Sequence, residues 1–194
     1  MNISSHDLSC CINKAKEISE VYNSRSLNSS DPKRSLDLLT EVCTDSSGRP
    51  IEIYKGDGDE NDRWLYGTCL LYPEKSVVLY AHYLNSCWER FTVCKELFHI
   101  VLDQDEYRTI DIFQHIQNII LAFPDDEASP TKPVICEILA EIAAMEFMLP
   151  YLRREQIIKV NGWSAMDIAQ QYKIPCLLVE KYLSKHYMLN LKNN

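Results

Sequence analysis

The sequence has no long hydrophobic run, no excess of positive charge and no pair of cysteines at C-x-x-C spacing. A membrane-spanning helix needs roughly 20 apolar residues in a row, and the longest apolar stretches here are broken by charge or proline before they reach that length. The 20 Lys and Arg against 28 Asp and Glu give a net charge of −8. This balance argues against a broad nucleic acid-binding surface, because neutralising phosphates needs an excess of Lys and Arg; a small local basic patch is left open.

The amino-terminal stretch 1–7 lacks the basic and apolar segments of a signal peptide. Eight cysteines in no paired spacing indicate reduced thiols rather than disulfides. We therefore expect a cytoplasmic protein. Five glycines, eight prolines and 46% hydrophobic residues exclude collagen-like and disordered chains and favour one globular domain with a small appendage.

Hydrophobic periodicity predicts two helical regions separated by a short β-rich segment. Helices are expected over residues 6–23, 35–44, 86–103, 108–122, 134–149, 151–159, 164–172 and 176–186, with a proline-rich loop at 124–133. Strands are expected over residues 51–54, 64–72 and 76–81, in a mostly antiparallel sheet. The predicted fold class is α+β, a mostly helical domain with a small three-stranded sheet and a C-terminal helical subdomain.

Residues 90–103 carry the pattern that points to chemistry. Lys95 and His99 are four residues apart, so they share one face of the predicted helix, and Glu96 is turned to the side. In an H-E-x-x-H zinc helix, two histidines at this spacing bind the metal and the glutamate handles the proton of the water. Lys95 stands where the first histidine of that pattern would be.

The stretch RFTVCKELFH at residues 90–99, after the predicted strands, resembles the active helix of the ImmA/IrrE family of zinc metallopeptidases, R-x-F-T-x-A-H-E-x-G-H. EILAEIAAMEFMLP at residues 137–150 resembles that family's second signature, E-x-x-A-x-x-F-A-x-x-L-L-M-P. The resemblance covers roughly residues 10–150. It implies a zincin-like fold, Glu96 as the general base, His99 and Glu137 as zinc ligands, and helix-turn-helix repressors as targets.

Two departures from the family pattern bear on this site. A protonated Lys95 has no lone pair for zinc, and Phe98 replaces the usual glycine. Lys95 falls within an apolar stripe of the helix, where an ammonium needs a carboxylate partner. We therefore predict a salt bridge between Lys95 and Glu137, with His99 beside it. Glu141, on the same face of its helix, is the second candidate for the ligand position.

Simpler structural roles are left open for these residues. His99 fits a hydrogen-bonded core histidine, and Glu96 fits a solvated surface residue. A rearranged metal site would need a third donor such as His82, His115 or Cys94, and the spacing supports none of them in particular; Cys94 is turned well away from His99 on the same helix.

The C-terminal region resembles a degenerate helix-turn-helix, in which Ser164 and Asp167 have the spacing of a capping box. The polar residues of its second helix include Glu180, Lys181, Ser184 and Lys185. This is too little basic or amide-bearing surface for a helix that recognises bases in the DNA groove. We therefore favour a packing or docking role for this helical pair over DNA binding. The expected domains are 1–150, metallopeptidase-like, and 151–194, helical.

The sequence supports three hypotheses for the function of this protein. The leading hypothesis is an inactive or impaired metallopeptidase-like protein that binds a helix-turn-helix repressor or antitoxin-like partner of a mobile element or stress system, without a bound metal. The alternatives are an active zinc-dependent endopeptidase with a rearranged site and a DNA-binding regulator that acts through the C-terminal subdomain. No membrane association is expected.

Overall fold

The computed structural model describes residues 3–28, 30–56, 66–102, 132–160, 162–185 and 187–188. Its elements, in chain order, are α1 (Ser5–Arg25), α2 (Leu36–Ser47), β1 (Ile51–Gly56), β2 (Gly67–Leu71), β3 (Ser76–Ala81), α3 (Ser86–Val101), α5 (Lys132–Met148), α6 (Tyr151–Val160), α7 (Ala165–Tyr172) and α8 (Cys176–Leu183). Each predicted helix that the structure describes is confirmed, although α8 ends at Leu183 and Ser184 is extended, short of the expected end at 186. The expected helix at 108–122 and most of the loop at 124–133 lie outside the described residues.

The three strands form a mixed sheet in the order β1-β3-β2. β2 runs antiparallel to β3, whereas β1 runs parallel to β3, with Ile51 opposite Ser76 and Ile53 opposite Val78. The expectation of a mostly antiparallel sheet is therefore wrong for one of the two strand pairs. The alternating pattern of β1 fixes which side chains face the core, but it carries no information on strand direction.

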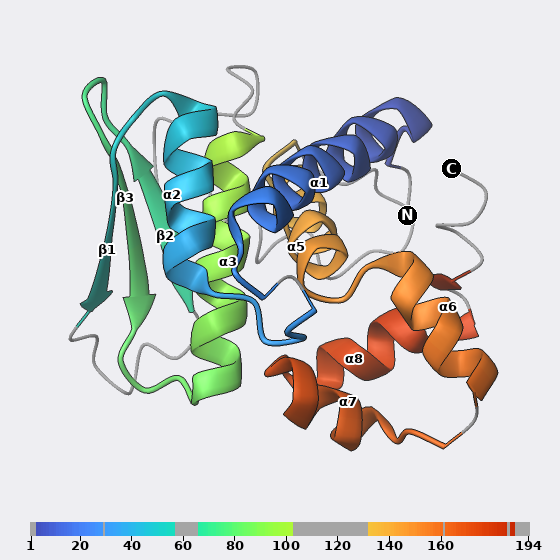
Figure 1. Ribbon diagram of the computed structural model, residues 1–194. Coiled ribbons are helices and arrows are strands. Elements are labelled where there is room, and N and C mark those ends of the chain that lie inside the picture. Colours follow the sequence, from blue (N-terminus) through green and yellow to red (C-terminus); the bar gives the residue numbers. More distant parts are fainter. Residues whose placement is uncertain are drawn as a thin grey trace.

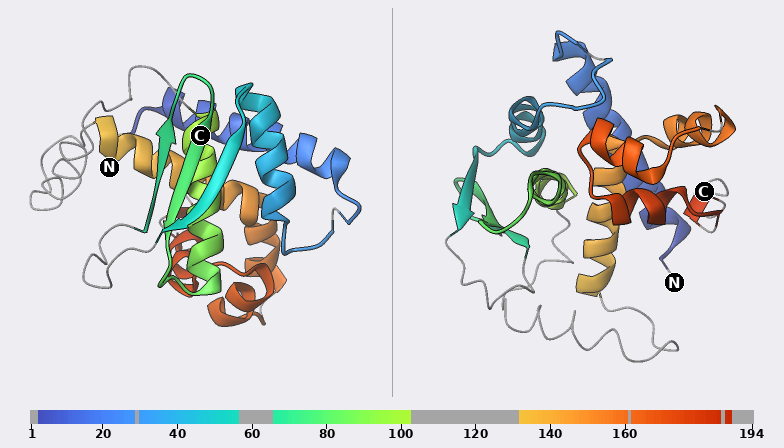
Figure 2. Two further views of the ribbon diagram at one scale, coloured as in Figure 1. Left: turned by 90° about the vertical axis from the view of Figure 1, so that its left-hand side faces the viewer. Right: turned by 90° about the horizontal axis from the view of Figure 1, so that it is seen from below.

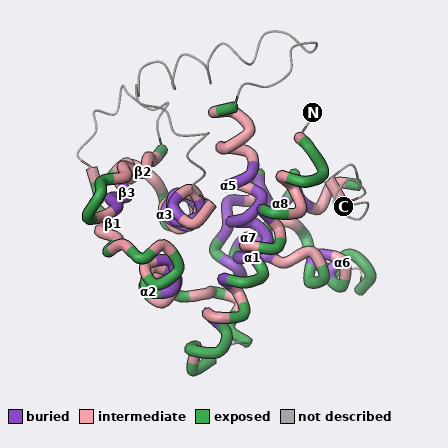
Figure 3. The backbone as a smooth tube through the Cα atoms, turned by 90° about the horizontal axis from the view of Figure 1, so that it is seen from above, coloured by how far each residue is buried: buried purple, intermediate pink, exposed green. Residues whose placement is uncertain are grey.

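The elements are stacked in layers, as Figure 1 shows. The sheet packs on α3, α2 lies beside α3, and α5 lies on the next layer with α1. Seen from the side of the sheet in Figure 2, no described helix lies in front of the strands. In Figure 3 the buried stretches concentrate on α3 and α5, and α3 is buried around most of its circumference because it has the sheet on one side and α5 on the other.

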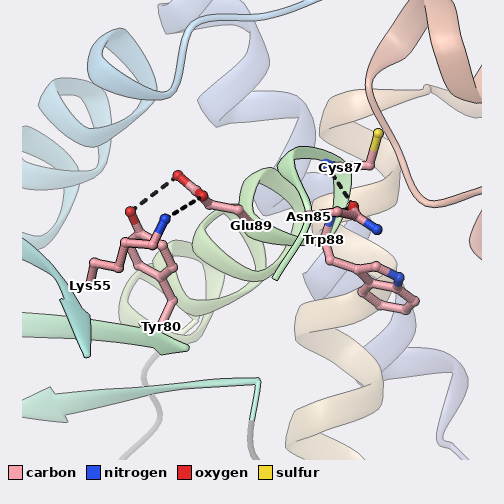
Figure 4. A network of polar contacts seen from close by, with 6 residues as sticks. All are labelled: Lys55, Tyr80, Asn85, Cys87, Trp88 and Glu89. Atoms are coloured by element: carbon pink, nitrogen blue, oxygen red, sulfur yellow. Dashed lines mark hydrogen bonds and ion pairs between the residues drawn. The ribbon is translucent and has the colours of Figure 1, made fainter. Parts of the chain in front are cut away.

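The amino-terminal half of α3 is fixed by polar contacts (Figure 4). The Asn85 side chain caps the helix by accepting hydrogen bonds from the backbone N–H groups of Cys87 and Trp88, both at 3.1 Å. One turn on, Glu89 accepts a hydrogen bond from the Tyr80 hydroxyl and one from Lys55 Nζ. These contacts tie α3 to β3 and β1 and so set the position of the motif that follows on this helix.

The C-terminal helices α6–α8 continue from α5 and pack back onto it. Ser164 and Asp167 form the predicted capping box at the start of α7. From α8, Lys181 Nζ donates to Glu141 on α5 at 2.5 Å, and the Tyr182 hydroxyl donates to the same carboxylate at 2.9 Å. No helix within the described ranges is long and apolar enough to cross a membrane.

Candidate functional site

The motif residues of α3 meet the second signature on α5. Lys95 Nζ lies 2.5 Å from Glu137 Oε2 and 2.9 Å from Glu96 Oε1. His99 Nε2 lies 3.1 Å from Glu137 Oε1. The predicted salt bridge between Lys95 and Glu137, with His99 beside it, is therefore confirmed, and we call these four residues the α3–α5 polar cluster.

The α3–α5 polar cluster lies at the edge of the core. The side chain of Glu96 is 3% exposed and that of Lys95 17% exposed, whereas Glu137 reaches 30%. Burial by itself lowers the pKa of an ammonium, but the charges of Glu96 and Glu137 outweigh it and raise the pKa of Lys95 above its ordinary value. Lys95 is therefore fully protonated at neutral pH.

Glu96 differs most from what its sequence position indicated. The reading of Glu96 as a solvated surface residue is wrong, because the side chain is buried beneath β2. Gly67 in β2 approaches α3 so closely that an added Cβ would lie 2.4 Å from Thr92 Cγ2 and 3.4 Å from Glu96 Cγ. The sheet thus covers the flank of α3 that a simple amphipathic pattern assigns to solvent.

The other candidate donors are placed elsewhere. Glu141, one helical turn after Glu137, accepts hydrogen bonds from Lys181 and Tyr182. His82 is exposed after β3, and Cys94 is fully buried in the core, where desolvation raises its thiol pKa well above the ordinary value. His115 lies outside the described residues.

The donor set of the α3–α5 polar cluster does not fit a three-ligand zinc site. Zinc binds imidazole nitrogen and carboxylate oxygen at about 2.0–2.2 Å, so His99 Nε2 and Glu137 Oε1, 3.1 Å apart, are close enough to share one ion. The third position, however, holds the Lys95 ammonium, which has no lone pair to offer. Within the described part of the chain, no group of three or more His, Cys, Asp or Glu side chains could hold a metal ion.

A known protein family matches most of the chain. The family model of the IrrE N-terminal-like domain, a peptidase family, matches residues 50–184. The chain belongs to this family. The match runs from the start of the sheet through the α3–α5 polar cluster to α8, and the α+β, zincin-like fold class expected from the sequence is confirmed.

Among solved structures, the chain is similar to a Mycobacterium tuberculosis transcriptional regulator, at 15% sequence identity and a TM-score of 0.49. The similarity covers 86% of this chain and 45% of the regulator, so the chain spans less than half the length of that protein. No curated protein matches the sequence.

Two polar features of the fold escaped the sequence analysis. One is the buried ion pair between Glu146 on α5 and Arg154 on α6. The other is a pocket with Arg34 and Arg153 in its wall. Glu146 and Arg154 lie eight residues apart across the α5–α6 junction, a spacing that no single-helix rule would have picked out.

Proposed function

We propose that this IrrE-like chain is a metallopeptidase-like protein that binds a protein partner without cleaving it. The observation that carries this proposal is the Lys95 ammonium, placed at a ligand position of the family motif and within 2.9 Å of both Glu96 and Glu137. A zinc peptidase needs three protein ligands and an open position for water. Lys95 takes the place of one ligand. Its ammonium also forms ion pairs with Glu96 and Glu137, the two carboxylates that the family resemblance assigns as general base and zinc ligand.

Glu96 is the residue that the family resemblance assigns as general base. A general base needs a carboxylate within hydrogen-bonding reach of the proton it abstracts. Glu96 Oε1 is instead in contact with Lys95 Nζ, and the residue is covered by β2. This arrangement favours an ion-paired structural role for Glu96 over proton transfer.

The surface beside the cluster supports binding of an extended peptide segment. Of the described strands, only β3 pairs with β2, so β2 is an edge strand next to the polar cluster. Ala81 donates its N–H to Tyr66 O and Tyr72 donates its N–H to Lys75 O, so the alternation places the N–H groups of Gly67 and Leu71 on the side away from β3. An edge of this kind adds a strand from a partner through main-chain hydrogen bonds.

The partner class follows from the family resemblance: a helix-turn-helix repressor or an antitoxin-like regulator of a mobile element or stress system. The direct test mixes the purified chain with a helix-turn-helix regulator from the same organism, chosen first from genes that lie next to its own. We expect binding by isothermal titration calorimetry and an unchanged repressor mass after prolonged incubation with zinc. Repressor cleavage would overturn the proposed loss of activity, and absence of binding would overturn the partner.

A substitution in β2 tests whether the partner binds at this strand edge. Leu71→Pro removes an N–H that points away from β3, and Leu71→Ala is the matched control that loses the same side-chain packing but keeps the N–H. We expect Leu71→Pro to weaken repressor binding at least tenfold more than Leu71→Ala. Equal losses in the two variants would exclude strand addition at β2.

Metal content separates this proposal from a rearranged zinc site. We expect elemental analysis of the purified chain to find far less than one zinc per chain. About one zinc per chain, retained through mild chelation, would require a third donor from outside the described residues and would support the endopeptidase alternative.

DNA binding through α7 and α8 remains the weakest alternative. Lys181, the most promising cation of α8, is committed to Glu141 at 2.5 Å, and the chain carries a net charge of −8. We expect no mobility shift of duplex DNA at physiological salt. A salt-sensitive shift at submicromolar protein would reverse this order of hypotheses.

A further inference from the structure

A second site lies away from the α3–α5 polar cluster, in a pocket of about 260 Å³. Its walls come from three parts of the chain: the α1–α2 connection with Asp31 and Arg34, the α5–α6 junction with Arg153, and the end of α7 with Tyr172. Figure 1 shows the α1–α2 connection running down toward α7. The pocket is therefore built at the contact between the main body and the C-terminal helices.

Several contacts position Arg34 in this wall. Its guanidinium lies 4.4 Å from the centroid of the Phe147 ring and 5.3 Å from that of Tyr22. One nitrogen, Nη1, donates to Ser19 Oγ at 3.2 Å. Its backbone is fixed as well, because Arg90 donates to the Arg34 carbonyl at 2.6 Å.

Arg153 approaches the same pocket from α6. Its Nε donates to the Tyr172 hydroxyl at 2.8 Å, and its Nη1 donates to Gln156. Since the Tyr172 oxygen accepts that bond, its own proton is left to donate elsewhere. Neither Arg153 nor Arg34 is ion-paired with a carboxylate of the described residues.

The charge of the pocket is therefore unbalanced. The described residues that line it include two guanidiniums and one carboxylate, Asp31, which is exposed and accepts a hydrogen bond from the Lys33 N–H. Desolvation lowers the pKa of Arg34, as expected for a partly buried cation that lacks a counter-ion. Arg153 is exposed. In a chain with a net charge of −8, two arginines of one pocket that are not ion-paired within the described residues need an explanation.

We propose that this pocket binds a small oxyanion, a phosphate or carboxylate group held between Arg34 and Arg153 and hydrogen-bonded by the Tyr172 hydroxyl. Planar guanidiniums suit both groups because they offer paired N–H donors. The volume of about 260 Å³ fits an anion the size of a phosphate monoester or a short dicarboxylate, since drug-sized ligands occupy about 300–1,000 Å³. This inference is independent of the proposed function of the α3–α5 polar cluster.

The test measures binding of inorganic phosphate and of succinate by isothermal titration calorimetry at low ionic strength. We expect one of the two to bind with a millimolar or tighter Kd, and the stronger ligand identifies the group that the pocket prefers. Arg153→Gln should weaken that ligand about tenfold. Arg34→Lys, which keeps the charge but loses the planar donor pair, should also weaken it.

A variant with the opposite effect makes the test stringent. Asp31→Asn removes the one carboxylate of the pocket and should tighten anion binding several-fold. Arg25→Gln is the matched control, because Arg25 is exposed, lies outside the pocket and is paired with Asp45; it should bind like the wild type. The proposal is overturned if neither anion binds, or if Arg153→Gln and Arg34→Lys both bind as the wild type does while circular dichroism shows them folded.

Discussion

The Lys95 ammonium lies between two carboxylates, so substituting it affects two ion pairs rather than one. Lys95 contacts Glu96 at 2.9 Å and Glu137 at 2.5 Å, and Glu137 also lies 3.1 Å from His99. Sequence reasoning predicted the contact with Glu137 but not the one with Glu96. The consequence is an asymmetry: removing Lys95 strands two acids, whereas removing either acid leaves Lys95 with the other.

This asymmetry predicts unequal costs of substitution. Lys95→Met should lower the free energy of unfolding by about 3 kcal/mol or more, because it leaves the buried Glu96 uncompensated next to Glu137. Glu137→Gln should cost only about 1 kcal/mol, since Glu96 still neutralises Lys95. Urea denaturation of both variants measures the difference. Lys14→Met, which removes a helix-surface pair with Glu17, is the control and should stay within about 0.5 kcal/mol of the wild type; equal losses for Lys95→Met and Glu137→Gln would contradict this account.

Replacing Lys95 by the histidine of the family motif tests whether this position can bind metal. Lys95→His supplies an imidazole one turn before His99 and opposite Glu137, which completes three protein donors. We expect this variant to retain zinc through mild chelation, measured as zinc per chain by elemental analysis. The double variant Lys95→His with Glu137→Gln should retain much less. If Lys95→His takes up no zinc, then Phe98 or the surrounding packing closes the site.

Two neighbouring cysteines on α1 differ in burial, and this difference predicts different reactivity. Cys10 is exposed, whereas Cys11 is buried and donates to the Leu139 carbonyl. Burial, with a smaller contribution from the charge of Glu146, raises the pKa of Cys11 to about 12. The reactive species is the thiolate, and at pH 8.5 its fraction in a group of this pKa is below about one in a thousand.

We therefore expect iodoacetamide at pH 8.5 to modify Cys10 within minutes and to leave Cys11 unmodified in the folded protein. Cys43 should be protected in the same way, because burial raises its pKa to about 12. Tandem mass spectrometry of the digested protein assigns each site, and labelling in urea serves as the control in which all three react. Equal labelling of Cys10 and Cys11 in the native state would mean that α1 opens readily.

At the scale of elements, the contact between β2 and α3 decides how the polar cluster is covered. Gly67 lies close against α3: an added Cβ would lie 2.4 Å from Thr92 Cγ2 and also 3.1 Å from the Leu79 carbonyl of β3. Glycine is therefore required here for space rather than for backbone conformation. The strand could not lie this close to α3 with any larger residue.

Gly67→Ala should destabilise the fold by about 1–3 kcal/mol, the range for overpacking a well-packed site. Thr92→Ser removes the methyl group that the new Cβ meets, so the double variant should recover part of the loss. Chemical denaturation measures both. Gly162→Ala, at a position with nothing within 4 Å of the added Cβ, is the control and should stay within about 0.5 kcal/mol. A neutral Gly67→Ala would show that β2 can move away from α3.

For the molecule as a whole, the sequence could predict the local elements and part of the site. Periodicity predicted α1, α3 and α7 within a few residues, and two linear signatures were enough to pair Lys95 with Glu137. The sequence did not predict the direction of β1 relative to β3. In the sheet order β1-β3-β2, β3 pairs with β1 across the intervening strand β2 of the sequence, and local patterns carry no information on such a pairing. Glu96 was misjudged for the same reason: its burial depends on a strand about 30 residues earlier in the chain, which helical periodicity does not register.

A buried charge pair also holds the C-terminal helices to the body. Arg154 on α6 is 0% exposed and pairs with Glu146 on α5. The second oxygen of Glu146 accepts a hydrogen bond from the Tyr151 N–H at 3.0 Å, and the Arg154 guanidinium lies 5.4 Å from the centroid of the Tyr182 ring on α8. One buried ion pair thus connects α5, α6 and α8.

Breaking this ion pair from one side should be more damaging than replacing it entirely. Arg154→Met leaves Glu146 buried without its counter-ion and should lower the free energy of unfolding by about 3–5 kcal/mol. Arg154→Met combined with Glu146→Leu removes both charges and should recover much of that loss, although the Tyr151 N–H then loses its acceptor. Urea denaturation of the two variants gives the comparison, with Lys159→Met, an exposed α6 residue, as the control expected to stay near the wild type. If the double variant is as unstable as the sum of its single changes, then the charges act separately, and the attachment of α6–α8 depends on apolar packing and on the contacts of Glu141.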